Sequence, residues 1–538
     1  MMRCYQAVQL IRPSKRPLLQ PFPWYHPSSS TTSRFTPHSD ATIPPYSFIR
    51  RHRHHLASME GRLQEHLDRR LREGTLRALM PAPKPQHCND TSLTFDTSPS
   101  QSTIDFASND YLGLARCSEQ HDLVQSAYSR LFPSSHGKEA TSETRQPLLG
   151  ATGSRLLSGD SNLARSLEEK LAQFHNRPAA LLFNSGYDAN LSILSSLPYA
   201  HGDAIVMDEL VHNSLVMGVR MGRLEKGRVF SFKHNDVMDL KRVLGEVSSR
   251  SSSPSSTLIV IESVYSMDGD IAPLNEILEL AQDKGAGVIL DEAHGLGVYG
   301  HTNTQDLELA TDKKLDFESF DGQNNTDKNK KDIKVKGGTG VLSALNLENH
   351  PALLCSIHTF GKAAGCHGAV VAGSSTLISY LVNYARPFVY STALPPHSLV
   401  SIQKSYESMM GVKGERRREK VFQWVKLFRK EMSKGIDALK EDYPSSDFEL
   451  LPSPSPIQAV VVPGNERCIS VCQYLRNVGM FDVYPIRTPT VTRGKERIRI
   501  ILHSHNNEDE IRGLITMMLG FLRQLLVTPN CLKLKAKL

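Results

Sequence analysis

One lysine of the chain stands in a setting that an ordinary surface lysine does not need. The stretch "SIHTFGKAAG" places Lys362 among small residues, between two glycines and three positions after Thr359. A lysine amine with such neighbours can reach an aldehyde and form a Schiff base with it, and the Thr359 hydroxyl can bind a phosphate. The alternative is a lysine on a glycine-rich surface turn. Taken alone, the pattern leaves both interpretations open.

An acid and a histidine follow an apolar run in "GVILDEAHG". Asp291 comes at the end of an expected buried strand, and His294 follows three residues later. A buried carboxylate is costly unless a positive charge accompanies it. A protonated pyridine nitrogen would supply that charge, and Asp291 would then keep the ring electron-accepting, with His294 near the ring's phenolic oxygen. The alternatives are a carboxylate that caps a turn and a turn histidine with its own hydrogen bonds.

A candidate phosphate-binding turn lies upstream, where "LLFNSGYDAN" runs from an expected strand into an expected helix. Ser185, Gly186 and Tyr187 fall at the helix N-terminus, where free N–H groups and the helix dipole favour a phosphate. Gly186 permits close backbone approach, although ordinary helix capping is the alternative. This turn, the Asp-x-x-His pair and the later Thr-Phe-Gly-Lys are together far more specific than any one of them.

The elements that must position these residues are short apolar strands alternating with helical segments. The strands are expected in "PAALLFNSG", "DAIVMDEL", "STLIVIESVYS", "GAGVILDEAHG" and "HGAVVAGS". Near-continuous apolar strands are typical of a sheet covered on both faces, and their alternation with helices predicts an α/β fold with a mostly parallel sheet. Ligands of such sheets bind beyond the carboxyl ends of the strands, so the chemistry is expected there.

Composition and charge exclude several classes of protein. The 538 residues are 39% apolar and 22% charged, and no apolar run is long enough for a transmembrane helix. The net charge of +7 arises largely before Met59, where eight Lys or Arg residues accompany one acid. We find no basic stripe interleaved with aromatics that would indicate nucleic-acid binding. The eight cysteines are scattered, without a metal-binding pattern, and indicate reduced thiols in an intracellular protein.

The sequence predicts five consecutive segments. They are a disordered basic leader at 1–58, a helical segment at 59–100, a large α/β domain at 101–395, a smaller α+β domain at 396–527 and a tail at 528–538. The leader resembles an organellar transit peptide, or else is an untranslated stretch wrongly included by gene prediction, with Met59 as the true start. Two charged or polar stretches are expected to be inserted surface loops, one at about 301–340 and a smaller one, "SSHGKEATSETRQP".

At the level of motifs the chain resembles a known family. The motifs are "DFASNDYLGLA", "GATGSRLLSGDSNLARSLEEKLAQF", "ESVYSMDGDIAPL", "LDEAHGLGVYG", "HTFGKAAG" and "IRTPTVTRGKERIRI". In this order, over about residues 60 to 527, they resemble the α-oxoamine synthases, which are fold-type-I pyridoxal 5'-phosphate (PLP) enzymes. The resemblance implies a PLP-dependent acyltransferase that joins an amino acid to an acyl-CoA with loss of carbon dioxide, and it implies a homodimer with active sites at the interface.

The resemblance also implies roles for individual residues. The implied catalytic residues are Lys362, Asp291, His294 and His212. The implied cofactor-binding residues are these four with Ser185, Gly186, Tyr187, Glu262, Ser266, Thr359 and Thr392. The implied substrate-binding residues are Arg77, Asn109, Arg487 and Thr490.

Several of these roles are specific. Lys362 resembles the lysine that binds the PLP aldehyde, and His212 the histidine stacked on the ring. Thr392 resembles a phosphate contact donated by the second subunit, and Arg487 the arginine that binds the substrate carboxylate. The chain departs from the family at Tyr187, where phenylalanine is usual, at Ala364, where a bulkier apolar residue is usual, and in its two long insertions.

The two ends of the chain point to different members of the family. The chain ends in Ala-Lys-Leu, which resembles a peroxisomal address read by an import receptor. That favours the member that condenses alanine with pimeloyl-CoA in biotin synthesis. A mitochondrial leader would favour 5-aminolevulinate synthase or glycine C-acetyltransferase instead. A serine palmitoyltransferase-like or secondary-metabolite acyltransferase and a non-catalytic partner subunit are further alternatives.

Overall fold

The computed structural model describes residues 47–72, 103–132, 149–250, 255–300, 337–488 and 490–527. The chain divides into two units, Met1–Arg69 and Arg70–Leu538. Helix α1 (Ser47–Arg72) begins inside the segment predicted as a disordered leader, so the helix starts earlier than the expected boundary at Met59. The prolines of the leader end at Pro45, and the next proline is Pro81, beyond the end of α1.

The second unit is built on a seven-stranded sheet whose strands have the order β2-β8-β7-β6-β5-β3-β4. The strands are β2 (Ala179–Phe183), β3 (Ala204–Asp208), β4 (Val229–Phe232), β5 (Thr257–Glu262), β6 (Gly287–Asp291), β7 (Leu353–Thr359) and β8 (Ala369–Gly373). Only β8 runs antiparallel to the rest of the sheet. The prediction of a mostly parallel sheet is therefore confirmed, and β4 and β7 add to the five expected strands.

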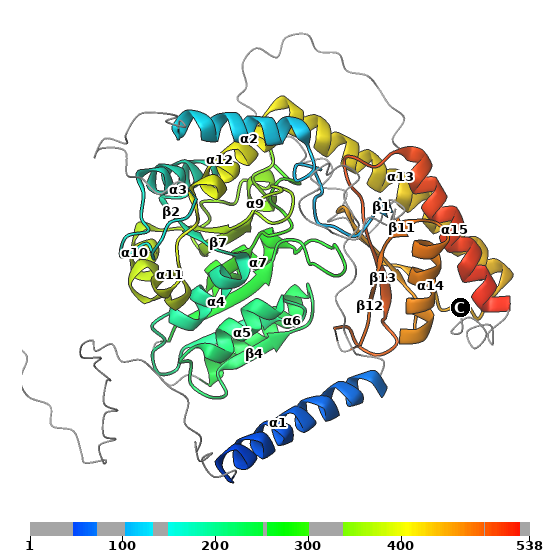
Figure 1. Cartoon of the computed structure of the whole chain (residues 1–538), viewed down its shortest axis with the longest axis horizontal. Helices are drawn as coiled ribbons and strands as arrows, with labels where there is room; N and C mark the ends of the chain where they lie inside the picture. The colour runs from blue at the N-terminus through cyan, green and yellow to red at the C-terminus, as the bar shows by residue number, and fades with distance from the viewer. Residues whose placement is uncertain are drawn as a thin grey trace, which may run out of the picture. The chain divides into compact units, whose positions relative to one another are not determined.

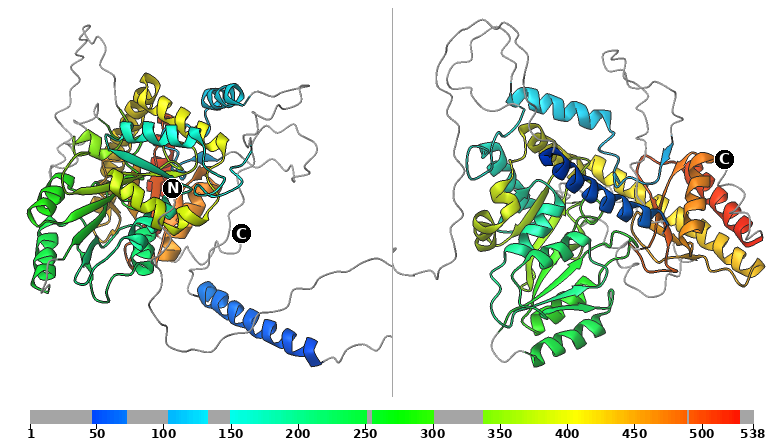
Figure 2. Two further views of the ribbon diagram at one scale, coloured as in Figure 1. Left: turned by 90° about the vertical axis from the view of Figure 1, so that its left-hand side faces the viewer. Right: turned by 60° about the horizontal axis from the view of Figure 1, so that its bottom comes forward.

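Helices cover both faces of this sheet. Helices α4 (Gly186–Ser196) and α5 (Asn213–Met221) lie on one face, and α6 (Val237–Ser249) and α7 (Leu274–Asp283) on the other (Figure 2). Right-handed crossovers require this arrangement, because the chain crosses the sheet in one direction from β2 to β4 and in the opposite direction from β4 to β6. The flanking helices that complete this part are α2 (Ser118–Leu131), α3 (Asn162–Phe174), α9 (Val341–Ala344), α10 (Ser375–Tyr384), α11 (Arg386–Tyr390) and α12 (Pro396–Met410).

A second, smaller sheet has the order β12-β13-β10-β9. Its strands are β9 (Glu449–Leu450), β10 (Ile457–Val461), β12 (Tyr484–Ile486) and β13 (Arg497–Ile501). The helices of this domain are α13 (Val412–Asp442), α14 (Asn465–Asn477) and α15 (Glu508–Val527). The short strands β1 (Ile104–Asp105) and β11 (Phe481–Asp482) pair in parallel beside it. Figure 1 shows α13 and α15 side by side at this end of the molecule. The smaller domain is thus α+β.

The hydrophobic cores do not divide at residue 395, where the domain boundary was expected. Leu399 and Tyr406 of α12 pack in the core of the large sheet, whereas the second core includes Phe106 and begins along α13 at Trp424. The sequence pattern gives the helical period of α12 and α13 but does not say which core each apolar face covers.

The larger predicted insertion ends earlier than residue 340. Residues 301–336 lie outside the described part of the chain, but Gly337, Gly338, Thr339 and Gly340 are buried. The Gly297 N–H donates to the Gly338 carbonyl at 2.7 Å, and the Gly340 N–H to the Tyr299 carbonyl at 2.9 Å. These four residues therefore belong to the fold. The smaller insertion, the tail at 528–538 and Arg77 lie outside the described residues.

Candidate active site

The turn between β2 and α4 has the features of a phosphate cradle. Ser185 caps α4, and its hydroxyl accepts a hydrogen bond from the Asp188 N–H at 3.1 Å. A Cβ atom added at Gly186 would clash with the Thr359 hydroxyl, so only glycine lets these two segments approach so closely. Among the described residues, no protein acceptor takes the N–H groups of Gly186 and Tyr187. Two donors at a helix N-terminus are therefore available to an anion.

A buried acid faces the same cavity from the end of β6. The Asp291 carboxylate accepts a hydrogen bond from Asn190 Nδ2 at 2.7 Å and another from the Ala293 N–H at 2.9 Å. Asn190 also donates to the Ser214 hydroxyl at 2.9 Å, and this hydroxyl lies 2.7 Å from His212 Nδ1. Asn190 therefore fixes both Asp291 and, through Ser214, the ring of His212.

The lysine and the histidine of the two motifs are in direct contact. Lys362 Nζ lies 2.7 Å from His294 Nε2, and His294 Nδ1 lies 2.6 Å from the Tyr111 hydroxyl. If Nε2 accepts from Lys362, the proton of the neutral ring is on Nδ1 and donates to Tyr111. The Tyr111 hydroxyl can in turn donate to Asn109 Oδ1, 3.3 Å away, which also accepts from Arg499 at 2.9 Å. The contacts form one continuous chain from Lys362 to Arg499.

Burial sets the protonation of this group. Burial lowers the pKa of Lys362 to about 8, opposed by the charges of Asp291 and Glu262 and assisted by Arg499. Burial also lowers the pKa of His294 well below its usual value, and the neighbouring Lys362 adds to this effect. The site therefore holds a lysine that is readily neutral beside a histidine that is neutral.

A second buried acid supports the loop that carries His212. The His212 N–H donates to Glu262 Oε1 at 2.5 Å. Burial raises the pKa of Glu262 well above its usual value, and the charge of Asp291 adds to that effect. Burial lowers the pKa of His212, against the opposing charge of Asp291. Hydrogen bonds to both its backbone and its ring thus hold His212 at the N-cap position of α5.

These groups line one cavity of about 280 Å³. Of the residues predicted from the sequence, the lining includes Ser185, Gly186, Tyr187, His212, Glu262, Asp291, His294, Thr359 and Lys362. They come from the carboxyl ends of β2, β3, β5, β6 and β7, as the rule for parallel sheets predicts. Lys362 and Asp291, which are 71 positions apart, thus face the same space.

Other predicted residues do not line this cavity. Asn109 lies one contact behind it, bonded to Tyr111 and Arg499. Ser266 contributes its backbone carbonyl to Arg499 at 2.8 Å. Arg487 follows β12, and its carbonyl accepts from the N–H of Thr490, an exposed residue. The described contacts do not bring Arg487 or Thr490 to the cavity, so their roles stay predictions, as does that of Arg77.

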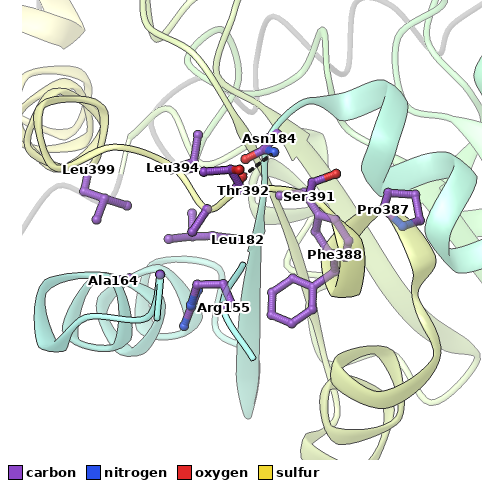
Figure 3. A pocket seen from close by; sticks show the side chains of 13 residues that line it. Arg155, Ala164, Leu182, Asn184, Pro387, Phe388, Ser391, Thr392, Leu394 and Leu399 are labelled. Carbon is purple, nitrogen blue, oxygen red and sulfur yellow. Dashed lines mark hydrogen bonds between the residues drawn. The ribbon is translucent and has the colours of Figure 1, made fainter. Parts of the chain in front are cut away.

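Thr392 lies in a different place. It lines a neighbouring pocket with Asn184, Arg155 and Phe388, and Asn184 Nδ2 donates to its carbonyl at 3.0 Å (Figure 3). The residue itself is exposed, and it is not among the residues that line the Lys362 cavity.

Sequence reasoning missed several residues of the site. Asn190, Tyr111, Arg499 and His367, of which Asn190 and His367 line the cavity directly, were not predicted. Asn190 lies one helical turn after Gly186, on the same side of α4, and Tyr111 lies two positions after Asn109 within a motif. An arginine between isoleucines, as in "RIRI", is a further signal, because an apolar strand rarely carries a charge without a partner.

The lining residues fit PLP. The α4 N-terminus and Thr359 would bind the phosphate, Lys362 would bind the aldehyde carbon, and Asp291 would pair with the ring nitrogen. The fit rests on the free N–H groups at Gly186 and Tyr187, on the close approach that Gly186 allows, and on a buried carboxylate whose protein partners are neutral donors.

Comparison with known proteins agrees with this geometry. The family model for aminotransferase class I and II matches residues 102–516. The 8-amino-7-oxononanoate synthase of Emericella nidulans is 35% identical over 437 residues, which are 79% of this chain and 90% of that protein. The enzyme of the same name from Methylococcus capsulatus is 34% identical over 427 residues, or 79% of this chain and 90% of that one. A solved structure of SPT with PLP superposes with a TM-score of 0.61 at 25% identity, covering 79% of this chain and 88% of that one.

Proposed function

The chain belongs to the aminotransferase class I and II family of PLP-dependent enzymes, and we propose that it is an 8-amino-7-oxononanoate synthase. It would condense L-alanine with pimeloyl-CoA and release 8-amino-7-oxononanoate, CoA and carbon dioxide. The relatives of that name, which align with about four fifths of the chain, carry the proposal. The cavity that joins Lys362, Asp291 and His294 supports it, because a non-catalytic partner subunit would not need this set.

PLP, when bound, supplies an aldehyde for the substrate amine and an electron-accepting ring. The chain's own groups supply the rest. Asp291 holds a proton at the ring nitrogen and is itself oriented by Asn190. Once the substrate amine has displaced Lys362 from the aldehyde, the freed Lys362 amine would take a proton from the substrate Cα as a general base. Burial lowers the pKa of this free amine to about 8, so part of it is neutral near pH 7. His294, in contact with Lys362, keeps the amine directed into the cavity. Arg487 remains the proposed partner of the substrate carboxylate.

The proposal is tested by product formation from a panel of thioesters. Purified protein is supplied with PLP, and release of free CoA is followed with alanine, glycine or serine as the amino acid and acetyl-, pimeloyl- or palmitoyl-CoA as the acyl donor. We expect alanine with pimeloyl-CoA to have the highest kcat/KM, and Lys362→Ala to abolish turnover. The matched control is Lys440→Ala, since Lys440 is exposed on α13.

A second candidate comes from the solved structure of SPT that the fold resembles. A preference for serine with palmitoyl-CoA would overturn the biotin-pathway proposal in favour of that one. Turnover with glycine and a short acyl-CoA would instead indicate 5-aminolevulinate synthase or glycine C-acetyltransferase activity.

We also propose that the enzyme is a homodimer in which Thr392 serves the partner's site. Its exposure and its place in a pocket apart from its own Lys362 support this. Mixing Lys362→Ala with Thr392→Ala chains should restore activity, because one of the two mixed sites then carries both native residues. Full activity of Thr392→Ala alone would contradict the shared site.

Peroxisomal localisation through the terminal Ala-Lys-Leu is a separate proposal. Deleting these three residues should move a fluorescently tagged protein from peroxisomes to the cytosol. Mitochondrial fluorescence that persists only when residues 1–58 are present would support the leader instead. Among the described residues, no helix combines the length and the apolar run needed to cross a membrane.

A further inference from the structure

A partly buried histidine outside the cavity lies between two carboxylates. His234, just after β4, has Nδ1 at 3.0 Å from Asp208 Oδ1 and Nε2 at 2.6 Å from Asp270 Oδ2. A neutral imidazole has only one N–H donor, so hydrogen bonds to a carboxylate at each nitrogen require the protonated ring. The Asp208 side chain is fully buried, and that of His234 is 19% exposed. The group is therefore a partly buried Asp–His–Asp ion triad.

The charges around His234 favour its protonated form. Burial lowers the pKa of His234, but the hydrogen bonds and charges of Asp208 and Asp270 outweigh burial and raise the pKa to about 10. Two other titratable groups lie close to His234. The Tyr265 ring packs edge-on with its centroid 4.3 Å from that of the imidazole, and the Glu209 carboxylate accepts a hydrogen bond from the backbone N–H of His234 at 3.2 Å. Neither opposes the positive charge.

Asp208 connects the triad to the turn that carries His212. Asp208 is the last residue of β3, and its carboxylate also accepts the N–H of Leu210 at 2.8 Å and that of Asn235 at 2.9 Å. It therefore shapes the turn between β3 and α5, in which the His212 N–H is bonded to Glu262. A shift of Asp208 would move this wall of the cavity.

Asp270 connects the triad to the smaller domain. Residues 265–270 form a tight turn, here called the interdomain hairpin, closed by bonds from the Tyr265 N–H to the Asp270 carbonyl at 3.0 Å and from the Gly269 N–H to the Tyr265 carbonyl at 2.9 Å. Gly269 has a positive φ of 77°, which favours glycine. His234 and Asn235 both hold the Asp270 carboxylate at 2.6 Å, so the base of the hairpin is fixed to the large domain.

The tip of the interdomain hairpin is seated on the smaller domain. Asp268 forms an ion pair with Arg497 of β13. The Gly269 carbonyl accepts from the Ser453 hydroxyl at 2.9 Å, and a Cβ atom at Gly269 would clash with the Ile457 carbonyl. Arg499, which ends the hydrogen-bond chain from Lys362, donates to the Ser266 carbonyl at 2.8 Å. The hairpin is therefore a rigid connection between the two sheets beside the cavity.

We propose that His234 is a positioning residue that, as an imidazolium held by Asp208 and Asp270, sets the smaller domain and its Arg499 against the PLP cavity. It touches neither cofactor nor substrate and acts through the interdomain hairpin and the His212 turn. The inference rests on the described contacts and not on which amino acid or acyl-CoA the enzyme uses.

The test compares His234→Gln with a matched control, His201→Gln. Gln keeps one hydrogen bond but not the charge, and His201 is 82% exposed on the same domain. Hydrogen–deuterium exchange of the PLP-loaded protein should become on the order of tenfold faster or more at residues 265–270 and 209–213 in His234→Gln. It should stay at the wild-type rate elsewhere in the large sheet and throughout His201→Gln.

A pH series on the wild-type protein gives a second readout that needs no variant to fold. Exchange at residues 265–270, corrected for its intrinsic pH dependence, should be slow up to about pH 9 and accelerate as pH passes about 10, where His234 loses its proton. His234→Gln should lack this transition, and its kcat/KM should fall at least tenfold while the absorbance of bound PLP remains. Unchanged exchange at the hairpin in His234→Gln, or no transition near pH 10 in the wild type, would overturn the proposal. Because exchange uses no substrate, these outcomes are independent of the 8-amino-7-oxononanoate assignment.

Discussion

The amine of Lys362 should titrate near pH 8 in the cofactor-free protein. The difference between the ordinary lysine value of 10.5 and about 8 corresponds to about 3.4 kcal/mol of free energy against the protonated amine. At pH 7 about a tenth of Lys362 is then neutral, against roughly 0.03% of an ordinary lysine, so its reactivity toward an electrophile should be about 300-fold higher on this ground alone. Burial is the main cause, and the charge of Asp291 acts against it.

The assay is competitive acylation with trace acetic anhydride between pH 6 and 11, read by mass spectrometry on the Lys362 peptide. Lys440, exposed on α13, provides the internal reference. Two variants, which should shift the pKa of Lys362 in opposite directions, test whether neighbouring charges act on it. Asp291→Asn removes a charge that raises the pKa of Lys362, so the midpoint should fall below 8, whereas Arg499→Gln removes a charge that lowers it, so the midpoint should rise.

Three results would refute this reasoning. A Lys362 midpoint near 10.5 would mean that the amine is not desolvated. A shift of both variants in the same direction would mean that the charges of Asp291 and Arg499 do not act on it as described. Equal labelling of Lys362 and Lys440 at pH 7 would remove the basis for a readily neutral general base.

Further predictions concern the residues that hold the cofactor. Gly186→Ala should lower PLP affinity at least tenfold, as measured by absorbance titration, because its Cβ atom would clash with the Thr359 hydroxyl; binding at the wild-type level would show that the two segments can separate. Asn190→Ala removes a 2.7 Å hydrogen bond to the Asp291 carboxylate and should cost about 1.5–3 kcal/mol, seen as weaker PLP binding, while an unchanged affinity would remove Asn190 from the site. Glu292→Ala should lower the free energy of unfolding by about 3 kcal/mol or more in urea denaturation, because the Val341 and Leu342 N–H groups at the start of α9 and the Ser263 hydroxyl all lose their buried acceptor. A loss below about 1 kcal/mol would contradict this.

Much of the cavity followed from the sequence because parallel strands deliver their carboxyl ends to one edge. Once "GVILDEAHG" and "LLFNSGYDAN" were assigned to strands that end at Asp291 and before Ser185, their polar residues had to meet there. Lys362 was expected at the same place through the resemblance, without knowledge of the strand that carries it. That strand, β7, was not predicted, because Ser356 and His358 interrupt its apolar pattern. In the fold these two side chains are buried and hydrogen-bonded to each other at 2.9 Å. A buried strand can therefore contain polar residues that hide its apolar pattern in the sequence.

The partners of the predicted residues could not be derived from spacing. Tyr111 and Arg499 reach the site from segments nearly four hundred positions apart, and only the packing of the smaller domain on the large one joins them through Asn109. The same packing decides that α12 covers the large core although its sequence reads like the start of the smaller domain. Contacts that depend on tertiary packing leave no periodic signal in a single sequence.

The backbone hydrogen bonds between Gly297 and Gly338 and between Tyr299 and Gly340 make the stretch between residues 300 and 337 a suitable place to insert another sequence. Because these two bonds hold residues 297–299 beside residues 338–340, a sequence inserted between them closes a loop whose ends already lie together, and each doubling of its length costs roughly 0.6 kcal/mol. A fluorescent reporter or an affinity module inserted between residues 300 and 337 should therefore leave unchanged the strand register on which Asp291 depends.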